Sequence, residues 1–222
     1  MMKTVLKHIV AFTYKPLLVK YLSKIRIYTY ENIQLEISPE VFHPGFFFST
    51  KLLLKHIKPL SLRGKRLLEP GCGSGLISIY AAREGAIVTA TDINPVAIEF
   101  LKKNSRMNAV DLIIIHSDLF KNIPKQHFDI VAINPPYYKK EPLTPRDYAW
   151  HCGENGEYFT KLFEGLKGYL HPASEVYMVL FDGCDIDMIG TIAAENNFTM
   201  HCVLTTENLL EKNFIFKIEP AG

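Results

Sequence analysis

Phe128-Asp129-Ile130-Val131-Ala132-Ile133-Asn134-Pro135-Pro136-Tyr137 places an apolar run directly before two prolines. The run from Phe128 to Ile133 is typical of a buried strand. Because consecutive prolines offer no backbone N–H and disfavour the helical region, the strand must end at Asn134. A primary amide and the aromatic ring of Tyr137 are thereby fixed at the carboxyl end of a strand. In an open α/β sheet this is the end at which ligands bind, so the sequence predicts a site here.

Strands and helices alternate on both sides of this stretch, from residue 65 onward. We expect strands near 66–70, 87–91, 111–116, 128–134, 174–181, 199–204 and 212–218, and helices near 75–84, 95–107, 155–170 and 185–196. This alternation predicts an α/β fold with a mostly parallel sheet and helices on both faces. Only a short turn separates the last two strands, so the final strand should be antiparallel.

The residues before this alternation predict a separate N-terminal arm. Helices are expected over 2–24, a β-hairpin over 26–30 and 33–37, and a helix over 51–57. A loop with three phenylalanines, Phe46 to Phe48, precedes that last helix and is a candidate lid. We therefore predict an arm of residues 1–60 and a main domain of residues 61–222.

Charge is distributed unevenly between the two parts. Residues 1–66 carry 12 Lys+Arg and 3 Asp+Glu, a balance of +9, whereas residues 67–222 carry 13 and 20, a balance of −7. These balances sum to the net charge of +2. A basic arm beside an acidic body is typical of contact with RNA, DNA or an acidic protein surface. A solvated helix face is the alternative interpretation of the same lysines.

Composition excludes several classes of protein. A chain with 48% hydrophobic and 22% charged residues is ordinary for a globular protein, which excludes general disorder. No stretch is long and uncharged enough to predict a signal peptide or a membrane span. The cysteines show no metal-ligand or redox spacing, which favours a cytoplasmic protein with reduced thiols and no metal. His43 and His151 have no partner at useful spacing, so neither is expected to be a base or a metal ligand.

A glycine loop and three acidic strand ends predict a cofactor pocket. Gly71-Cys72-Gly73-Ser74-Gly75 follows the first sheet strand, where small residues let a ligand approach the backbone at a helix N-terminus. Its spacing differs from the Gly-x-Gly-x-x-Gly of dinucleotide binders. Glu69 suits a cationic amino group, Asp92 the two hydroxyls of a ribose, and Asp118 an adenine amino group. As alternatives, Asp92 could cap the next helix and Asp118 could be a turn residue.

Together these groups favour S-adenosylmethionine, an adenosine with a charged amino-acid tail, as the ligand. The residues that follow the two aspartates, Ile93 and Leu119, are further candidate contacts, as is Asn134. The complete set of predicted cofactor-binding residues is Glu69, Gly71, Cys72, Gly73, Gly75, Asp92, Ile93, Asp118, Leu119 and Asn134.

Residues 26–222 resemble the class I S-adenosylmethionine-dependent methyltransferases. Asn134-Pro135-Pro136-Tyr137 matches the (Asn/Asp/Ser)-Pro-Pro-(Tyr/Phe/Trp) signature of amino methyltransferases. The resemblance implies a Rossmann-like, seven-stranded sheet of order 3-2-1-4-5-7-6. It also implies that the Asn134 side-chain oxygen and the Pro135 carbonyl accept both N–H bonds of a planar amide or exocyclic amine. Tyr137 would stack on that group.

The sequence from Ala149 to Gly156 is similar to the Ala-x-x-Gly-Gly-x-x-Gly segment of HemK-like glutamine methyltransferases. This resemblance implies a protein glutamine as the methyl acceptor, in a substrate like a translation release factor. The chain departs from those enzymes at Cys152, which replaces a glycine. It departs also at Phe46–Thr50, which replaces an acidic-threonine segment, and in the absence of a five-helix domain before the hairpin.

Two other functions stay open. An RNA or DNA adenine-N6 or guanine-N2 methyltransferase is the alternative, favoured by the basic arm because phosphate contacts dominate nucleic-acid affinity. A cofactor-binding partner protein without turnover is a remote alternative. For any acceptor, the candidate substrate contacts are Phe47, Phe48, Pro136 and Tyr138.

Overall fold

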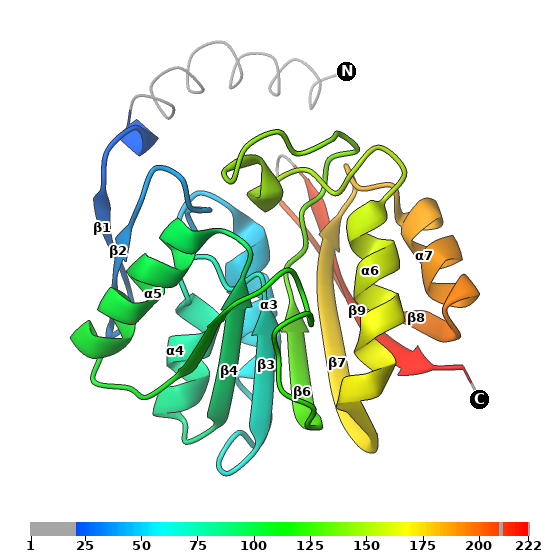
Figure 1. The fold of residues 1–222 in the computed structure, drawn as a ribbon, viewed down its shortest axis with the longest axis horizontal. Coiled ribbons are helices and arrows are strands. Elements are labelled where there is room, and N and C mark those ends of the chain that lie inside the picture. Colours follow the sequence, from blue (N-terminus) through cyan, green and yellow to red (C-terminus); the bar gives the residue numbers. More distant parts are fainter. Residues whose placement is uncertain (1–20, 209–210, 222) are drawn as a thin grey trace.

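The computed structural model describes residues 21–208 and 211–221, and Figure 1 shows their arrangement. The arm contains the hairpin β1 (Arg26–Tyr30) and β2 (Ile33–Ile37), followed by helix α3 (Phe48–Ile57). The sheet contains β3 (Arg66–Pro70), β4 (Ile87–Asp92), β5 (Ile113–His116), β6 (Phe128–Ile133), β7 (Leu170–Phe181), β8 (Phe198–Glu207) and β9 (Lys212–Pro220). Its helices are α4 (Leu76–Arg83), α5 (Pro95–Met107), α6 (Glu157–Leu166) and α7 (Ile186–Glu195).

The seven-stranded sheet has the order β5-β4-β3-β6-β7-β9-β8. Strands β3 to β7 pair in parallel, and β9 pairs antiparallel with both β7 and β8. The predicted α/β fold, the strand order and the antiparallel final strand are therefore confirmed. Because the order along the chain reverses between β3 and β6, the connections diverge there and leave a crevice at the carboxyl ends of these strands.

Alternating side chains divide the core between the two faces of the sheet. Leu67 and Ile130 belong to the core under α3, α4 and α5, whereas their neighbours Leu68 and Val131 belong to the core under α6 and α7. This period of two follows from the pleat of a strand. Figure 1 shows α6 in front of the sheet and α3 behind it. Helices on both faces thus hold the strand ends that carry the site.

Two asparagines of α5 fasten the hairpin to the body. Asn104 accepts from the Glu36 N–H at 2.8 Å and donates to the Glu36 carbonyl at 3.0 Å. Asn108 likewise accepts from and donates to the backbone of Gln34, at 3.1 and 2.6 Å. These amides satisfy backbone groups on the open edge of β2. The inward residues of β2 join the same core: Ile33, Leu35 and Ile37. The domain boundary at residue 60 stays a prediction.

Element boundaries differ from the predicted ones in two places that matter. Helix α3 begins at Phe48, so this phenylalanine lies in the helix and not in the preceding loop. The segment 155–170, predicted as one helix, ends at Leu166 and continues as a short 3-10 turn over Lys167–Tyr169. Strand β7 then begins at Leu170, earlier than expected, because it pairs with Phe128 before a register shift. The helices predicted over 2–24 lie almost entirely outside the described residues.

Three further observations concern the described residues alone. Within them, no helix is long and apolar enough to cross a membrane. No group of three or more His, Cys, Asp or Glu side chains there could hold a metal ion. All the cysteines are free, at Cys72, Cys152, Cys184 and Cys202. The cytoplasmic location stays a prediction.

Gly75→Ala should destabilise the fold more than Gly64→Ala. Both glycines have a positive φ, +84° at Gly75 and +74° at Gly64, where an L-residue costs about 1–2 kcal/mol. A Cβ at Gly75 would lie 2.1 Å from Leu101 Cδ1, whereas one at Gly64 would have nothing within 4 Å. We expect a further loss of about 1–3 kcal/mol from overpacking at Gly75, measured by urea unfolding. Equal losses would mean that Leu101 moves aside without cost.

Candidate active site

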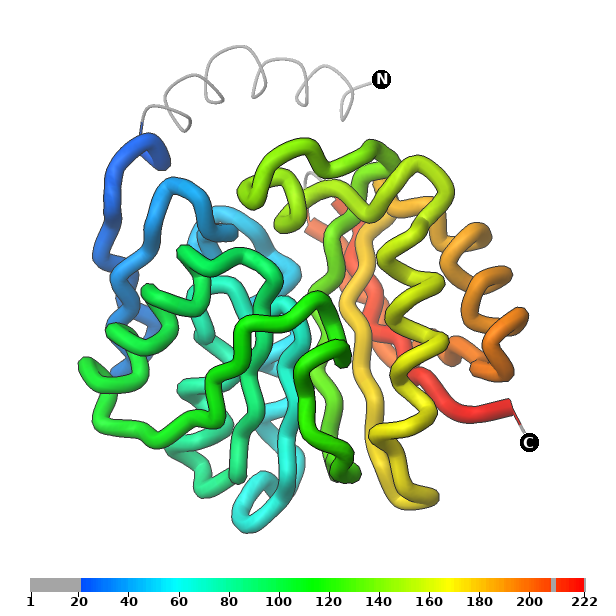
Figure 2. Tube along the Cα trace, viewed as in Figure 1, coloured from blue at the N-terminus to red at the C-terminus, as the bar shows by residue number. Residues whose placement is uncertain are grey.

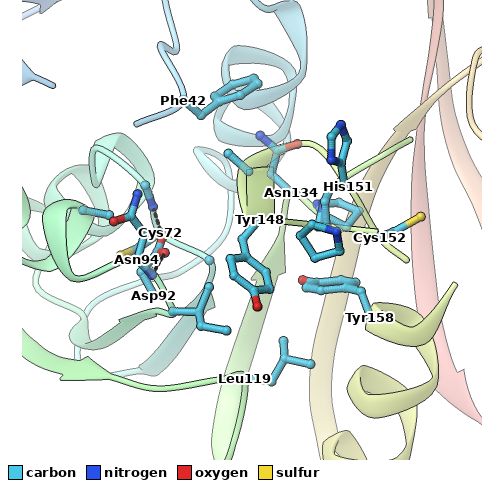
Figure 3. A pocket seen from close by; sticks show the side chains of 18 of the residues that line it. Phe42, Cys72, Asp92, Asn94, Leu119, Asn134, Tyr148, His151, Cys152 and Tyr158 are labelled. Atoms are coloured by element: carbon cyan, nitrogen blue, oxygen red, sulfur yellow. Dashed lines mark hydrogen bonds between the residues drawn. The ribbon is translucent and has the colours of Figure 1, made fainter. Parts of the chain in front are cut away.

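A cavity of about 330 Å³ lies at the carboxyl ends of β3, β4, β5 and β6. Its size is that of a small-molecule site, and Figure 3 shows its lining from close by. It brings together most of the residues predicted from the sequence. These are Glu69, Gly71, Cys72, Gly73, Asp92, Ile93, Asp118, Leu119, Asn134, Pro135, Pro136 and Tyr137.

Other predicted site residues do not line this cavity: Gly75, Phe47, Phe48 and Tyr138. The Phe47 ring packs on Phe42 and Trp150, with centroids 4.5 and 4.9 Å away. Phe48 is partly exposed at the start of α3, and Tyr138 is half exposed. Phe47 is thus in contact with Phe42, which lines the cavity. Contacts of Phe47, Phe48 and Tyr138 with a substrate stay predictions.

Asp92 holds the glycine loop in place. Its Oδ2 accepts from the Gly73 N–H at 2.9 Å, and its Oδ1 accepts from the Asn94 N–H at 2.8 Å. Burial raises the pKa of Asp92, and these backbone donors oppose the rise. Each carboxylate oxygen keeps a lone pair for a ligand. The cap of α5 is the Asn94 side chain, which accepts from the Val96 N–H at 2.9 Å.

Glu69 is an acid buried beneath the same loop, with 4% of its surface exposed. Its Oε2 accepts from the Ser78 N–H at 2.9 Å and from the Ser78 hydroxyl. Burial raises the pKa of Glu69 to about 8, although the two bonds from Ser78 act in the opposite direction. The side chain is therefore mostly protonated at neutral pH. A cation bound in the cavity would stabilise its charged form.

The amide of Asn134 is oriented by helix α3 and by Tyr137. Its Nδ2 donates to Thr50 Oγ1 at 3.0 Å, and its Oδ1 accepts from the Tyr137 hydroxyl. Burial raises the pKa of Tyr137, which keeps the phenol protonated as a donor. Because a carbonyl oxygen has two lone pairs, Oδ1 can accept one further N–H from a bound molecule. The Tyr137 ring packs edge-on against Phe181, at 5.1 Å, and its stacking on an acceptor stays a prediction.

The segment 138–156 crosses the carboxyl end of the sheet and meets the arm (Figure 2). Tyr138 and His151 form an isolated bridge within it. Trp150 packs on two rings of the arm, with centroids 5.1 Å from Phe42 and 4.9 Å from Phe47. Phe42 also lines the cavity, so the arm forms part of the site.

Several side chains of the cavity were not predicted from the sequence, namely Glu40, Phe42, Thr50, Tyr148, His151, Tyr158 and Lys161. Tyr158 and Lys161 stand three residues apart on α6, which places them on one face of a helix that leaves the sheet's carboxyl end. That spacing was a signal available in the sequence. His151, for which no catalytic or metal-binding role is expected, is brought to the cavity by its bridge to Tyr138.

Carboxylates dominate the charge of the lining. Besides the mostly protonated Glu69, the acidic residues are Glu40, Asp92, Asp118, Glu141 and Glu157, and Lys161 is the one Lys or Arg among the described lining residues. Lys161 is itself paired with Asp118, at 3.1 Å. A hollow lined mostly by one sign of charge concentrates ions of the other sign. The cavity therefore favours cationic or neutral ligands and disfavours phosphates.

A comparison with known families identifies the kind of enzyme. The family model for the methyltransferase small domain matches residues 32–151, more than half of the chain. The chain belongs to the methyltransferase small domain family. It is an S-adenosylmethionine-dependent methyltransferase of class I, in agreement with the sheet order and with the motifs at the strand ends.

A relative from Methanocaldococcus jannaschii is named "Putative protein N5-glutamine methyltransferase". It is 40% identical over 155 residues, which cover 67% of this chain and 76% of the relative. A ribosomal protein L11 methyltransferase from Thermosipho africanus is 38% identical over 105 residues, 46% of this chain but only 40% of its own length. The names of these two relatives thus specify different methyl acceptors.

Two solved structures share the fold at low sequence identity. The Mtq2–Trm112 complex of E. cuniculi, described as methylating the termination factor eRF1, has a TM-score of 0.62 and 19% identity. That match covers 82% of this chain and 99% of the other. The 16S rRNA G1207 methyltransferase RsmC of T. thermophilus has a TM-score of 0.61 and 19% identity, covering 87% and 50%. At these identities the likeness concerns the fold alone.

The cavity of this methyltransferase suits S-adenosylmethionine. Gly71 has φ +70°, and a Cβ there would have nothing within 4 Å, so the loop backbone is open to a ligand. The cofactor supplies a methyl group bonded to a positively charged sulfur, and the carboxylate-rich lining suits that charge. The placement of Glu69, Asp92 and Asp118 around the cavity is compatible with their predicted contacts to its amino, ribose and adenine groups.

Glu69→Gln should change how the stability of the ligand-free enzyme depends on pH. Between pH 4.5 and about 8, the unfolded chain has lost the Glu69 proton and the folded chain keeps it. Raising the pH across this window therefore favours unfolding, by at most about 1.4 kcal/mol per pH unit. We expect the wild type to lose stability relative to Glu69→Gln from pH 5 to 8, in denaturant titrations. The exposed Glu164→Gln is the control, and a pH-independent difference for Glu69→Gln would contradict the prediction.

Thr50→Val should slow methyl transfer, because the Asn134 amide loses the acceptor that fixes its orientation. Loss of a hydrogen bond of about 1.5 kcal/mol corresponds to roughly a tenfold lower kcat. KM for the cofactor should change less than kcat. Thr50→Ser keeps the hydroxyl and should restore most of the rate. A wild-type kcat in Thr50→Val would show that Thr50 does not position the Asn134 amide for the reaction.

Proposed function

We propose that this methyltransferase transfers the methyl group to the side-chain amide nitrogen of a glutamine in a protein substrate similar to a translation release factor. The relative from Methanocaldococcus jannaschii carries a glutamine N5 methyltransferase name, which supports this choice. The amide of Asn134 at the end of β6 also supports it, because it presents an oxygen acceptor to the cavity.

An amide nitrogen is a weak nucleophile because its lone pair is delocalised into the carbonyl. In the proposed reaction, the Asn134 side-chain oxygen and the Pro135 carbonyl accept the two N–H bonds of the glutamine amide. These bonds draw electron density onto the nitrogen and hold it toward the methyl donor. Most of the rate enhancement would then come from positioning and from exclusion of water. No strong base is required, since the methylated nitrogen can lose its surplus proton to water.

Thr50 and Tyr137 make Asn134 suitable for this role. Thr50 Oγ1 accepts the hydrogen bond from the side-chain nitrogen of Asn134, so the side-chain oxygen of Asn134 is the atom directed at a ligand. The Tyr137 hydroxyl occupies one lone pair of that oxygen and leaves the other. An acceptor held in this way needs no reorganisation when the substrate arrives, which is how preorganised polar groups contribute to catalysis.

The carboxylate-rich lining is the observation that carries the choice of a protein acceptor over RNA. Glu40, Glu141 and Glu157 are exposed side chains of this lining, beyond the carboxylates predicted to hold the cofactor. RNA would bring a row of phosphates toward them, and phosphate contacts dominate nucleic-acid affinity. A neutral glutamine side chain, or one flanked by basic residues, meets no such repulsion.

RNA remains the second candidate because of one specific observation. A small hollow that shares Glu40 and Val41 with the cavity is lined by Lys24, Arg26 and Arg146. The rings of Phe47 and Trp150 line the same hollow. Basic side chains beside aromatic rings are typical of surfaces that bind single-stranded nucleic acid.

Labelled methyl transfer separates the two acceptors. The enzyme is incubated with a cell extract and methyl-labelled S-adenosylmethionine, and the product is divided between nuclease and protease digestion. Under the proposal the label survives nuclease, is released by protease, and is recovered as N5-methylglutamine after complete enzymatic digestion. Label that is released by nuclease and resists protease would establish RNA as the acceptor instead.

Asn134→Ala is the matched variant for this assay. Because Asn134→Ala removes the acceptor for the substrate N–H, transfer should fall to background. The cofactor, held by its other predicted contacts, should still bind in calorimetry. Transfer at the wild-type rate would overturn the role of Asn134, whichever acceptor is labelled.

A further inference from the structure

The hydroxyl of Tyr158 is a buried polar group without a partner. Tyr158 lies in the first turn of α6, and its side chain lines the cavity. Its oxygen is shielded from solvent and makes no hydrogen bond to any residue that the structure describes. Buried polar groups are nearly always hydrogen-bonded, so an exception inside a ligand cavity points to the ligand as the missing partner.

Burial and two nearby carboxylates keep this hydroxyl protonated. Burial, and then the negative charges of Asp92 and Asp118, raise the pKa of Tyr158. The phenol is therefore neutral at any working pH, and its O–H is available as a donor. Both carboxylates are engaged by other donors and do not pair with it. Figure 3 shows the Tyr158 side chain directed from α6 into the cavity, above Leu119.

A phenol hydroxyl can both donate and accept a hydrogen bond. For its O–H donor, the missing partner is an acceptor located near Asp92 and Asp118. In the cofactor, the groups predicted to meet these residues are the ribose hydroxyls and the adenine amino group, both of which donate. Between sugar and amino group lies the purine ring, whose unprotonated nitrogens can only accept. The O–H of a neutral phenol complements such a nitrogen.

We propose that Tyr158 is a specificity residue that donates a hydrogen bond to a ring nitrogen of the adenine base. A site with a buried donor rejects ligands that lack the matching acceptor, because the donor is then left unpaired. Tyr158 would therefore distinguish adenine from bases in which carbon replaces that nitrogen. The proposal rests on the cofactor of this enzyme and not on the proposed glutamine acceptor.

The test compares Tyr158→Phe with wild type in calorimetric binding of S-adenosylhomocysteine and of its 1-deaza, 3-deaza and 7-deaza analogues. Tyr158→Phe should weaken binding of S-adenosylhomocysteine about three- to tenfold. One deaza analogue should bind wild type more weakly by a similar factor and be insensitive to the substitution. The proposal would be overturned if Tyr158→Phe bound S-adenosylhomocysteine with wild-type affinity. It would also be overturned if wild type bound all three deaza analogues more weakly by the same factor.

Unfolding of the ligand-free enzyme separates ligand recognition from a structural role. Because Tyr158→Phe removes an unpaired hydroxyl, the variant should be at least as stable as wild type without ligand. Its thermal shift on adding S-adenosylhomocysteine should nevertheless be smaller. Tyr80→Phe, on α4 and outside the cavity, is the matched control and should change neither quantity. Lower ligand-free stability with a wild-type thermal shift would assign Tyr158 to the fold and contradict the proposal.

Discussion

The site depends on the point at which β6 must stop. Pro135 and Pro136 offer no N–H to a neighbouring strand, so pairing cannot continue past Ile133. The chain leaves the sheet there and crosses its carboxyl end before α6 begins. Asn134 stands at this exit, where Thr50 of α3 can reach its amide. The two prolines therefore determine where three parts of the site lie: the Asn134 amide, the segment 138–156 that crosses the end of the sheet, and helix α6, which carries Tyr158.

The fold could be predicted because its signals are local. Apolar runs bounded by glycine and proline locate the strands to within a few residues, and their alternation with helices predicts a mostly parallel sheet. The strand order was predicted from the resemblance to class I methyltransferases. The motif residues could be found for the same reason. Asp92, Asp118 and Asn134 lie at the end of a strand or within two residues after it, and the carboxyl ends of parallel strands meet at one edge. Their chemical roles remain predictions.

The remaining part of the site depends on contacts between residues far apart in the chain. Trp150 meets Phe42 and Phe47 across about a hundred residues, and no periodicity within either segment indicates such a contact. Thr50 becomes a partner of Asn134 only once α3 has packed against the sheet. The protonation of Glu69 also depends on the folded structure. A charged carboxylate is expected from the sequence, whereas burial keeps the side chain protonated.

The protonation of Glu69 has a consequence for how the cofactor binds. If the carboxyl is neutral in the free enzyme and charged beside an ammonium group, each binding event releases a proton from it to the solvent. The affinity for the cofactor then increases with pH over the range in which the free enzyme keeps the Glu69 proton. The heat measured on binding also includes the ionisation heat of whichever buffer takes up the proton. The same association will thus have different apparent enthalpies in phosphate and in Tris.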